Sequence, residues 1–299
     1  MSEAPPFRSG FVALVGRPNA GKSTLLNRIV GHKLAIVSNK PQTTRTQIRG
    51  VLTRPDGQIV FLDTPGIHKP GYALNRRMMQ MVQEALMSVD VVLLLVDASS
   101  RRGSGDRFAE ELVLKSGKPV FLVLNKVDRV GDKERLLPLI QEMTEGKDYA
   151  EVVPISARTG RNVGRLVDAV LARLPEGPRY FDEDAYTDQP MRTLAAEIVR
   201  EKILHQTSEE IPYVTAVTVE RWDETDTIAK IYCLIFVERE SQKAIIIGRG
   251  AQRLKEIGSD ARAELEQILG KQVYLQAHVV VREQWRNNER LLDELGIEI

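Results

Sequence analysis

The stretch that decides the fold of the first half of this sequence is Phe11-Val12-Ala13-Leu14-Val15-Gly16-Arg17-Pro18-Asn19-Ala20-Gly21-Lys22-Ser23-Thr24-Leu25-Leu26. An apolar run precedes a loop bounded by two glycines, and a helix-like segment follows. A strand, a loop and a helix in this order form a phosphate-binding loop, in which backbone N–H groups hold an anion. We predict that residues 16–24 bind nucleotide phosphates. Lys22 would lie near the β- and γ-phosphates, and the Ser23 hydroxyl would bind Mg²⁺.

The composition is that of a soluble globular protein with room for two domains. The chain has 299 residues, of which 42% are apolar, and a net charge of +1. This charge argues against attraction of the whole molecule to nucleic acid, so only local patches remain as candidates. No run reaches the roughly 18 apolar residues of a membrane span, and the first ten residues lack the core of a signal peptide. The single cysteine, Cys233, lies in an apolar run, so we expect it to be buried in a cytoplasmic protein without internal disulfides.

The segment after the first helix, residues 31–50, is polar and shows little apolar periodicity. A polar loop beside a phosphate-binding loop can close over a γ-phosphate and complete the Mg²⁺ shell with a threonine. Thr44 is the candidate ligand, and Thr43 is the alternative. A surface loop without a function remains the competing interpretation of this segment.

A second buried strand, predicted at residues 58–62, ends in Asp63-Thr64-Pro65-Gly66. A carboxylate at the carboxyl end of such a strand can hold a Mg²⁺-bound water, which is the role we predict for Asp63. Gly66 would let its backbone N–H approach the γ-phosphate. Such a tetrapeptide alone is typical of an ordinary turn, so the prediction that Asp63, Thr64, Pro65 and Gly66 contact the nucleotide depends on the neighbouring motifs.

Apolar runs at residues 90–97 and 119–124 predict buried parallel strands. The second run ends in Asn125-Lys126-Val127-Asp128. A carboxylate at Asp128 can accept hydrogen bonds from N1–H and the exocyclic amine of guanine, whereas adenine presents an acceptor at N1 and is rejected. We expect Asn125 to tether the phosphate loop to the base loop, and the Lys126 stem to cover the base. A strand at residues 151–155 leads to Ser156-Ala157, whose backbone N–H is a candidate donor to guanine O6.

Five motifs, each at the carboxyl end of a predicted strand, resemble the translation-factor-like P-loop GTPases. The resemblance covers residues 1–178 and implies a doubly wound, mostly parallel α/β sheet that binds GTP and GDP with Mg²⁺. The implied metal ligands are Ser23, Thr44 and Asp63, and the implied catalytic residues are Lys22, Thr44, Gly66 and Asn19. Ras-like GTPases carry a water-orienting glutamine directly after the Asp-x-x-Gly, where this sequence has Ile67. We therefore expect slow intrinsic hydrolysis.

Asn19 is a candidate for binding a cation that accelerates this hydrolysis. In similar bacterial GTPases an asparagine at this position holds a K⁺ ion that acts in place of an arginine finger. We therefore treat K⁺ as a second candidate cofactor beside Mg²⁺. A polar residue in a tight loop, without any metal, is the equally weighted alternative.

Residues 179–190 change composition abruptly, with four acidic residues and three aromatic ones, and we predict a linker there. Over residues 191–299 the pattern predicts α-β-β-α-α-β, with strands at 213–221, 228–239 and 272–282. This order indicates an α+β domain with three strands and one helical face. A glycine turn joins two of its helices and is surrounded by basic residues; the candidate RNA contacts are Lys243, Gly248, Arg249, Gly250, Ala251, Arg253 and Lys255.

This turn resembles the Gly-x-x-Gly loop of a type II KH domain, which approaches the sugar-phosphate backbone of about four single-stranded nucleotides. Ala251 replaces the last glycine of that loop. The alternative interpretation is a helical hairpin that packs within the domain and does not contact RNA. Residues 191–299 hold 15 basic and 19 acidic residues, so RNA binding would depend on a local patch. Arg282, Trp285 and Arg286 would extend the contact, although Trp285 is equally a candidate core anchor.

The order of the two domains resembles the bacterial GTPases that assist assembly of the small ribosomal subunit. That resemblance implies a GTP-hydrolysing switch that binds small-subunit ribosomal RNA near its 3′ end, on the 30S subunit. An RNA-binding chaperone with a structural nucleotide is the alternative, and the motif from Asn125 to Asp128 excludes an ATP-dependent kinase. We expect a cytoplasmic monomer, and leave a peripheral contact with the inner face of the cell membrane open.

Overall fold

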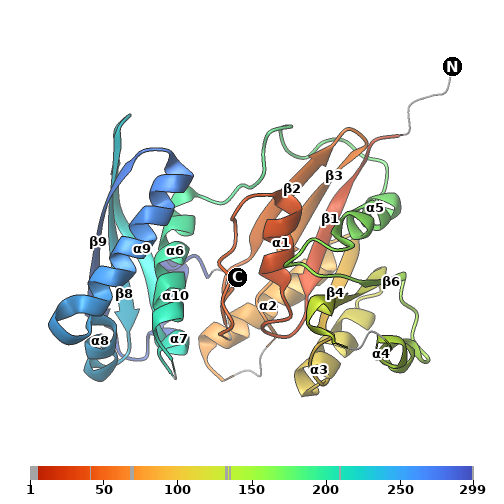
Figure 1. Cartoon of the computed structure of the whole chain (residues 1–299), viewed down its shortest axis with the longest axis horizontal. Helices are drawn as coiled ribbons and strands as arrows, with labels where there is room; N and C mark the ends of the chain where they lie inside the picture. The colour runs from red at the N-terminus through yellow and green to blue at the C-terminus, as the bar shows by residue number, and fades with distance from the viewer. Residues whose placement is uncertain are drawn as a thin grey trace. The chain divides into compact units, whose positions relative to one another are not determined.

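The computed structural model describes residues 6–40, 42–67, 71–131, 134, 136–208 and 210–297 (Figure 1). The chain forms two compact units. The first comprises Met1–Ala35, Thr44–Lys69 and Met78–Asp188, and the second comprises Ile36–Thr43, Pro70–Arg77 and Gln189–Ile299. Pro41 and residues 68–70, which belong to the two loops predicted to respond to the nucleotide, lie outside the described residues.

The first unit is built on one six-stranded sheet, which confirms the predicted doubly wound fold. Its order is β2 (Ile48–Arg54), β3 (Gly57–Asp63), β1 (Arg8–Val15), β4 (Val91–Asp97), β5 (Val120–Asn125) and β6 (Glu151–Pro154). Only the β2–β3 pair is antiparallel. The sequence pattern predicted a loop over residues 31–50 and no strand where β2 lies. As an edge strand, β2 pairs on one side only and its outer residues can stay polar.

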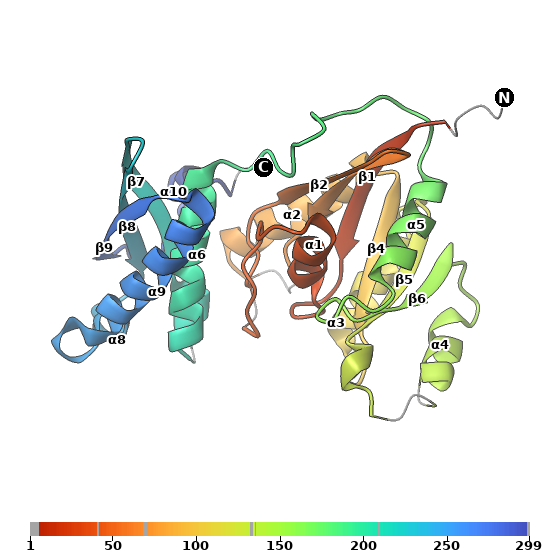
Figure 2. The ribbon, with the colours of Figure 1, turned by 45° about the horizontal axis from the view of Figure 1, so that its top comes forward.

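Helices cover both faces of this sheet. On one face α1 (Lys22–Val30) and α5 (Val163–Arg173) pack against Val12 and Leu14 of β1. On the other face α2 (Ala73–Ser88), α3 (Ser104–Leu114) and α4 (Leu136–Thr144) contribute residues to the core around Ala13 and Val15 (Figure 2). Because neighbouring strand residues point to opposite faces, the central strands are apolar throughout, as the sequence predicted. The phosphate loop lies between β1 and α1.

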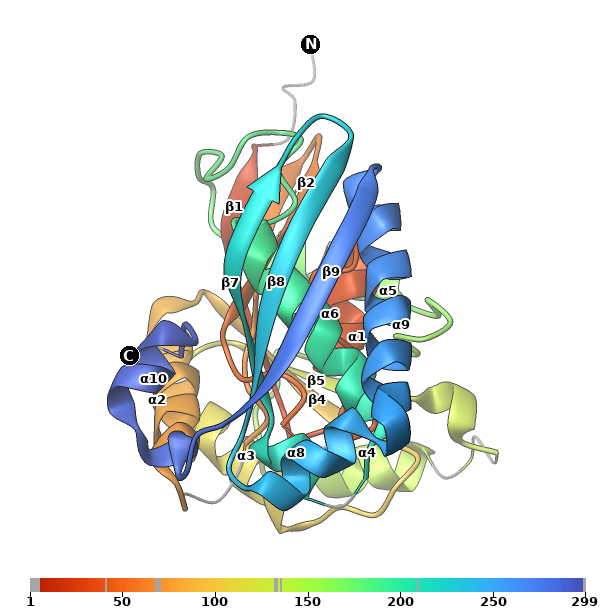
Figure 3. The ribbon, with the colours of Figure 1, turned by 90° about the vertical axis from the view of Figure 1, so that its left-hand side faces the viewer.

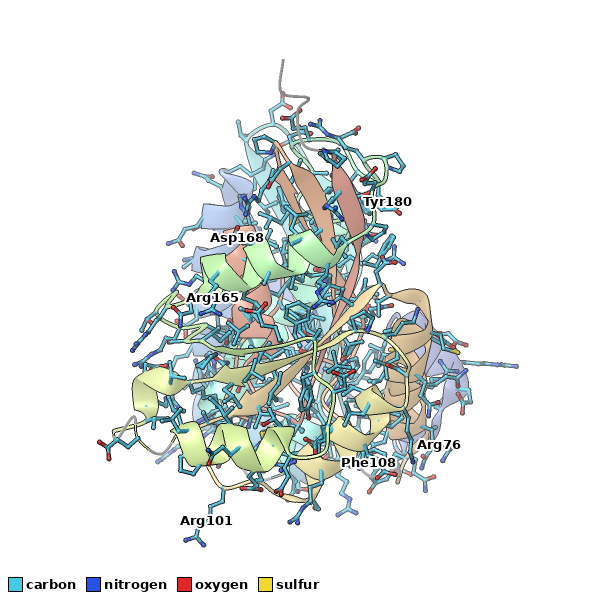
Figure 4. The ribbon with its side chains drawn as sticks, turned by 90° about the vertical axis from the view of Figure 1, so that its right-hand side faces the viewer. Arg76, Arg101, Phe108, Arg165, Asp168 and Tyr180 are labelled. Atoms are coloured by element: carbon cyan, nitrogen blue, oxygen red, sulfur yellow. The ribbon has the colours of Figure 1, made fainter. Side chains whose placement is uncertain are left out.

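The predicted linker begins as part of the first unit. The backbone N–H groups of Tyr180 and Phe181 donate to Oε1 of Gln58, at 2.8 and 3.0 Å, and Val51 N–H donates to Tyr186 O at 2.9 Å. Figure 4 shows this segment at Tyr180, beyond the end of α5. The compact units divide at residue 188, so only Gln189 and Pro190 of the predicted linker belong to the second unit. The boundaries at 178 and 191 stay predictions.

The second unit carries a three-stranded sheet with the order β7 (Ala216–Glu224), β8 (Ile228–Val237) and β9 (Gln272–Val281). Its main helices are α6 (Met191–Gln206), α8 (Glu240–Ile247), α9 (Gln252–Leu269) and α10 (Glu289–Glu294). This is the predicted α+β arrangement. The strand predicted at 213–221 begins later, because Pro212 lies in the first turn of a short helix, α7 (Ile211–Val214).

The structure of the second unit tests the predictions made for Trp285 and Cys233. Trp285 is fully buried, and its indole N–H donates to Val214 O at 2.7 Å, so Trp285 is a core anchor and not an RNA contact. Arg286 next to it pairs with Glu238 at 2.6 Å. Cys233 is buried as expected, and burial raises the pKa of its thiol to about 12. No helix among the described residues is long and apolar enough to cross a membrane.

Two segments from the first half of the sequence, residues 36–43 and 70–77, belong to the second unit. The guanidinium of Arg200 on α6 donates to Gln42 O at 3.3 Å and to Thr43 O. The Arg200 side chain is 1% exposed, and a buried guanidinium is costly unless its N–H groups are bonded. Glu197 balances the buried charge at 2.6 Å, and the two carbonyls accept further N–H groups, which holds the described part of residues 36–43 on α6.

Candidate nucleotide site and RNA groove

The three predicted Mg²⁺ ligands lie together at the carboxyl edge of the first sheet. The Ser23 hydroxyl donates to Oδ2 of Asp63 at 2.6 Å and is 2.9 Å from the Thr44 hydroxyl. Thr44 in turn donates to the same carboxylate oxygen at 3.5 Å. The other oxygen of Asp63, Oδ1, is buried without a hydrogen-bond partner among the described residues. Two hydroxyls and a carboxylate with an unused oxygen fit a hard cation such as Mg²⁺.

Two buried charges dominate the electrostatics of this site. Burial raises the pKa of Asp63 to about 6, against the opposing effects of Lys22 and of the Ser23 and Thr44 hydroxyls. Burial also lowers the pKa of Lys22, which Asp63 partly counteracts. The Lys22 ammonium donates to Gly16 O at 3.2 Å. An anion or a cation entering the site would relieve these desolvated groups, as nucleotide phosphates and Mg²⁺ would.

Glycine is required at two positions of the phosphate site. Gly21 has φ +99°, and a Cβ there would lie 2.2 Å from Nδ2 of Asn125. At Gly66 a Cβ would lie 2.9 to 3.1 Å from three atoms of Pro18. The first contact brings the base motif against the phosphate loop, and the second brings the backbone of residue 66 beside the same loop. Both close approaches are open only to a residue without a side chain.

Asn125 forms the tether expected from the sequence. Its amide group donates to Ala20 O at 2.8 Å, and its side-chain oxygen accepts from Ala157 N–H at 3.0 Å. The Ser156 N–H donates to Arg161 O at 3.1 Å. Both backbone groups that we proposed as donors to guanine O6 thus already have partners within the protein, and the O6 contact stays a prediction.

At the base end of the site, Asp128 is held by two neighbours. The Ser156 hydroxyl donates to its Oδ1 at 2.7 Å, and Arg158 pairs with Oδ2 at 2.9 Å. The Ser156 hydrogen bond is the main reason that the pKa of Asp128 is lowered. The carboxylate is therefore ionised at neutral pH, as an acceptor for guanine must be. The Arg158 side chain is 67% exposed and can leave when a base arrives.

Asp97, which was not among the predicted site residues, joins the two ends of the site. Asp97 accepts from Lys126 at 2.7 Å and lies 3.8 Å from Arg17 of the phosphate loop. Burial would raise the pKa of Asp97, but hydrogen bonds from Lys126 and Ser99 lower it. Its position at the carboxyl end of a buried strand was the available signal. Arg158, directly after Ser156-Ala157, was missed because nothing in the local sequence pairs it with Asp128.

The remaining predicted residues are placed as follows. The Arg17 guanidinium lies 3.2 Å from Asp106 at the start of α3, so its side chain is bound outside the phosphate loop. The Thr64 hydroxyl is buried and donates to Leu14 O at 2.7 Å, which is a structural role. Ile67 is 4% exposed and packs in the core. Asn19 is exposed and has φ +63°, in the left-handed region that asparagine tolerates.

In the second unit, the predicted RNA loop connects α8 to α9. Three of its residues have positive φ: Gly248 at 72°, Gly250 at 59° and Ala251 at 60°. A Cβ at Gly248 would lie 2.9 Å from Cβ of Arg253, whereas the space around Gly250 is open. Ala251 thus adopts the backbone conformation for which the usual glycine is suited, at a conformational cost.

Beside the loop, α9 and β9 line an open groove of about 370 Å³. Of the predicted RNA contacts, Ala251 and Lys255 line it, and the sequence analysis missed Ser259, Arg262 and the β9 residues Leu275, Gln276 and Ala277. Arg253 donates to Ile245 O of α8 instead. Lys243 lies in α8, and Arg249 is exposed at the tip of the loop. The helical period places Lys255, Ser259 and Arg262 on one side of α9, which was the missed signal.

Comparison with known proteins matches both units. The family model for 50S ribosome-binding GTPases covers residues 11–126, and the model for KH domains covers residues 210–286. A crystal structure of a variant of Aquifex aeolicus Era bound to GDP·AlF4⁻ is 42% identical, with a TM-score of 0.94, over 98% of this chain and 100% of that one. The chain belongs to the Era family.

A second Era structure has the same identity, 42%, the same TM-score, 0.94, and the same shares, 98% of this chain and 100% of that one. It holds MgGDPNP and nucleotides 1506–1542 of 16S ribosomal RNA. Membership in the Era family confirms the P-loop GTPase fold followed by a KH domain, and it makes this chain one of a family of GTPases.

The first prediction concerns Asp63. Because burial raises its pKa to about 6, its negative charge is present above that pH and is lost as the pH falls through it. We expect the affinity for a GTP analogue with Mg²⁺ to fall about tenfold from pH 7 to pH 5, as the carboxylate is protonated. Fluorescence titration at several pH values measures this. Asp63→Asn is the control, because its side chain does not titrate and any remaining pH dependence of the affinity comes from other groups, such as the nucleotide. An equal pH dependence of the affinity in the parent and in Asp63→Asn would contradict the prediction.

The second prediction concerns the left-handed residue of the RNA loop. Ala251→Gly should raise the free energy of unfolding of the second unit by about 1 kcal/mol, because glycine adopts positive φ without strain. Gly250→Ala is the matched control, since Gly250 has the same φ sign and open space around it, and should lower stability by a similar amount. Urea unfolding of the full chain measures both. A loss of stability in Ala251→Gly would show that the alanine methyl makes a stabilising contact.

Proposed function

We propose that this chain is a GTP-hydrolysing switch that binds single-stranded RNA near the 3′ end of small-subunit ribosomal RNA and assists assembly of the small subunit. The observation that carries the proposal is that one chain holds both the Ser23, Thr44 and Asp63 cluster and a Gly-x-x-Ala loop beside an open groove. Era structures with GDP·AlF4⁻, with MgGDPNP and with the 3′ fragment of 16S ribosomal RNA support both halves.

In this proposal the chain's own residues orient the reacting groups. Lys22 and the backbone N–H groups of the phosphate loop hold the phosphates, while Gly66 offers its N–H to the γ-phosphate. Ser23, Thr44 and Asp63 would hold Mg²⁺, which offsets negative charge that develops on the phosphates. Asp128 selects guanine. Ile67 carries no group that can orient the attacking water, so the unassisted reaction is slow.

We propose that Asn19 recruits K⁺ to assist this reaction. The third prediction is that K⁺ raises the GTP turnover rate at least about tenfold over Na⁺, and that Asn19→Ala removes this difference, because a cation in the loop offsets transition-state charge. Turnover is measured by phosphate release in matched KCl and NaCl buffers. Equal rates in the two salts would rule out the K⁺ role and leave Asn19 as a residue suited to positive φ.

Coupling between the nucleotide and the RNA is part of the proposal. Residues 36–43 directly precede Thr44 and belong to the same compact unit as the KH-domain helices. Arg200 on α6 holds the carbonyls of Gln42 and Thr43. A change in the Thr44 position on GTP hydrolysis would therefore move the carbonyls of Thr43 and Gln42, which lie one and two residues before it. Because a buried guanidinium is destabilised when its N–H groups lose their acceptors, Arg200 and α6 would follow that movement.

The fourth prediction tests this switch. A short RNA from the 3′ end of small-subunit ribosomal RNA should bind roughly tenfold more tightly in the GTP-analogue state than in the GDP state. Fluorescence anisotropy at two salt concentrations measures it, since a phosphate contribution weakens with salt. Identical affinity in both states would defeat the coupling, and absence of RNA binding in both states would defeat the RNA function.

The alternative is an RNA chaperone whose nucleotide is structural, which Ile67 favours because it implies slow turnover. Asp128→Asn distinguishes the two, since an amide should favour xanthine nucleotides. A switch should then follow XTP hydrolysis, whereas a chaperone should work with any bound nucleotide.

We further propose that the chain acts as a cytoplasmic monomer on the 30S subunit. This is supported by its single buried cysteine and by the ribosomal RNA in the related Era complex. A peripheral contact with the inner face of the membrane stays a hypothesis, tested by co-sedimentation with lipid vesicles.

A further inference from the structure

The sheet of the second unit is covered by helices on one face only. On β8 the inward residues Ala229, Ile231 and Cys233 are at most 1% exposed and belong to the core under the helices. Figure 3 shows the opposite face toward the viewer, and among the described residues no helix lies over the middle of the three strands. We call this surface the outer face; it is formed by the outward side chains of β7, β8 and β9.

The strand register arranges aromatic and cationic side chains side by side on the outer face. Arg221, Tyr232 and Gln276 lie opposite one another on the three strands, and Lys230 lies opposite Tyr274. The rings of Tyr232 and Tyr274 have centroids 6.0 Å apart, and the Arg221 guanidinium carbon lies 5.5 Å from the Tyr232 centroid. Tyr274 is 47% exposed. A tyrosine pair with two neighbouring cations is thus presented to solvent.

The chemistry of this pair favours single-stranded nucleic acid. Bases stack on exposed aromatic rings in a sequence-tolerant way, and arginine and lysine meet the phosphates. The carboxylate opposite Lys230, Asp223, pairs with Arg221 at 2.6 Å, so a neighbouring cation balances its charge. Tyrosines are common on sheets for their strand propensity alone. Their position beside the groove is what points to RNA.

The strand β9 belongs to both the groove and the outer face. Leu275 and Ala277 line the groove with α9, whereas Tyr274 and His278 alternate with them and point to the outer face. Gln276 lines the groove as well, accepts from the Tyr274 hydroxyl at 3.3 Å and lies 2.9 Å from the His278 ring. Because β9 is the edge strand of its sheet, no other strand separates the groove from the outer face on this side.

We propose that the outer face is a second RNA surface that receives nucleotides of a single strand extending beyond the groove, with a base stacked on Tyr274. The proposal rests on the RNA-binding function proposed for the groove. A KH groove takes about four nucleotides, so only a longer RNA reaches Tyr274. Tyr232 and Arg221 support the stacked base from the side, and Lys230 lies where a phosphate of the extended strand would pass.

The fifth prediction compares RNA lengths in the full chain. The probes are nested, fluorescein-labelled RNAs from the 3′ end of 16S ribosomal RNA, from about four to about twelve nucleotides, extended in either direction. Tyr274→Ala should weaken binding of the long RNA about tenfold and leave the four-nucleotide RNA unchanged, because one stacking contact is lost. Tyr274→Phe keeps the ring and should bind as the parent does. Tyr180→Ala removes a tyrosine of the same exposure, 47%, from the first unit and should change neither affinity (Figure 4).

Each outcome decides one of the two proposals. If the parent protein binds long and short RNA and Tyr274→Ala has no more effect than Tyr180→Ala, the outer face does not bind RNA while the groove function stands. If the parent binds neither RNA, the proposed RNA binding by the groove and by the outer face are both wrong. If Tyr274→Ala loses affinity for the long RNA alone, and Tyr274→Phe binds that RNA as the parent does, the result supports RNA binding by the outer face. Because Tyr274 is exposed, thermal unfolding of the variants should match the parent, and a large drop would assign Tyr274 to the fold instead.

Discussion

The nucleotide site depends on the side chain of Asn125, which bonds the phosphate loop at Ala20 and the loop of Ala157 at the same time. The two loops and Asn125 itself stand at the ends of three different strands, β1, β6 and β5, and the parallel sheet brings these carboxyl ends to one edge. The amide lies so close to Gly21 that no side chain fits there. The Asn125 side chain thus ties the phosphate end of the site directly to the base end, and Asp97 adds a second link through Lys126 and Arg17.

The free-energy cost of burying charged groups is the second constraint on the nucleotide site. Lys22 and Asp63 are both buried, and burial shifts the pKa of each toward its neutral form. Oδ1 of Asp63 has no protein partner among the described residues. A fold optimised only for stability would not keep such groups, because an unsatisfied buried oxygen costs about 1 to 3 kcal/mol. At the base end, by contrast, Asp97 and Asp128 are each satisfied by neighbours and keep lowered pKa values. The unsatisfied end of the site is therefore the end that ligands must complete.

The sequence predicted the central strands well, because buried parallel strands are continuous apolar runs. Four of the five motifs follow such a strand in the structure, whereas Thr44 lies between α1 and β2. It did not predict β2, whose single neighbour lets its outer residues remain polar, nor the short helix at Pro212. Asp97 and Arg158 were missed for another reason. Their partners, Lys126 and Asp128, come from other loops, and such pairs are set by tertiary packing rather than by local pattern. The groove residues Ser259 and Arg262 differ, since the helical period already places them on the same side of α9 as Lys255, and the packing of α9 on β9 completes the groove.

In the second unit, the proposed recognition of RNA would work against the net charge of the domain. Residues 191–299 carry more acidic than basic side chains, so the long-range field does not attract RNA. The groups proposed to contact RNA are concentrated in three places: the loop with positive-φ residues, the groove with Lys255 and Arg262, and the sheet face with Arg221 and Lys230. Short-range contacts of this kind discriminate by shape and by stacking, and they are less sensitive to salt than a field would be. If the proposed switch releases its RNA in the GDP state, a weak long-range field leaves the RNA affinity under the control of a few local contacts.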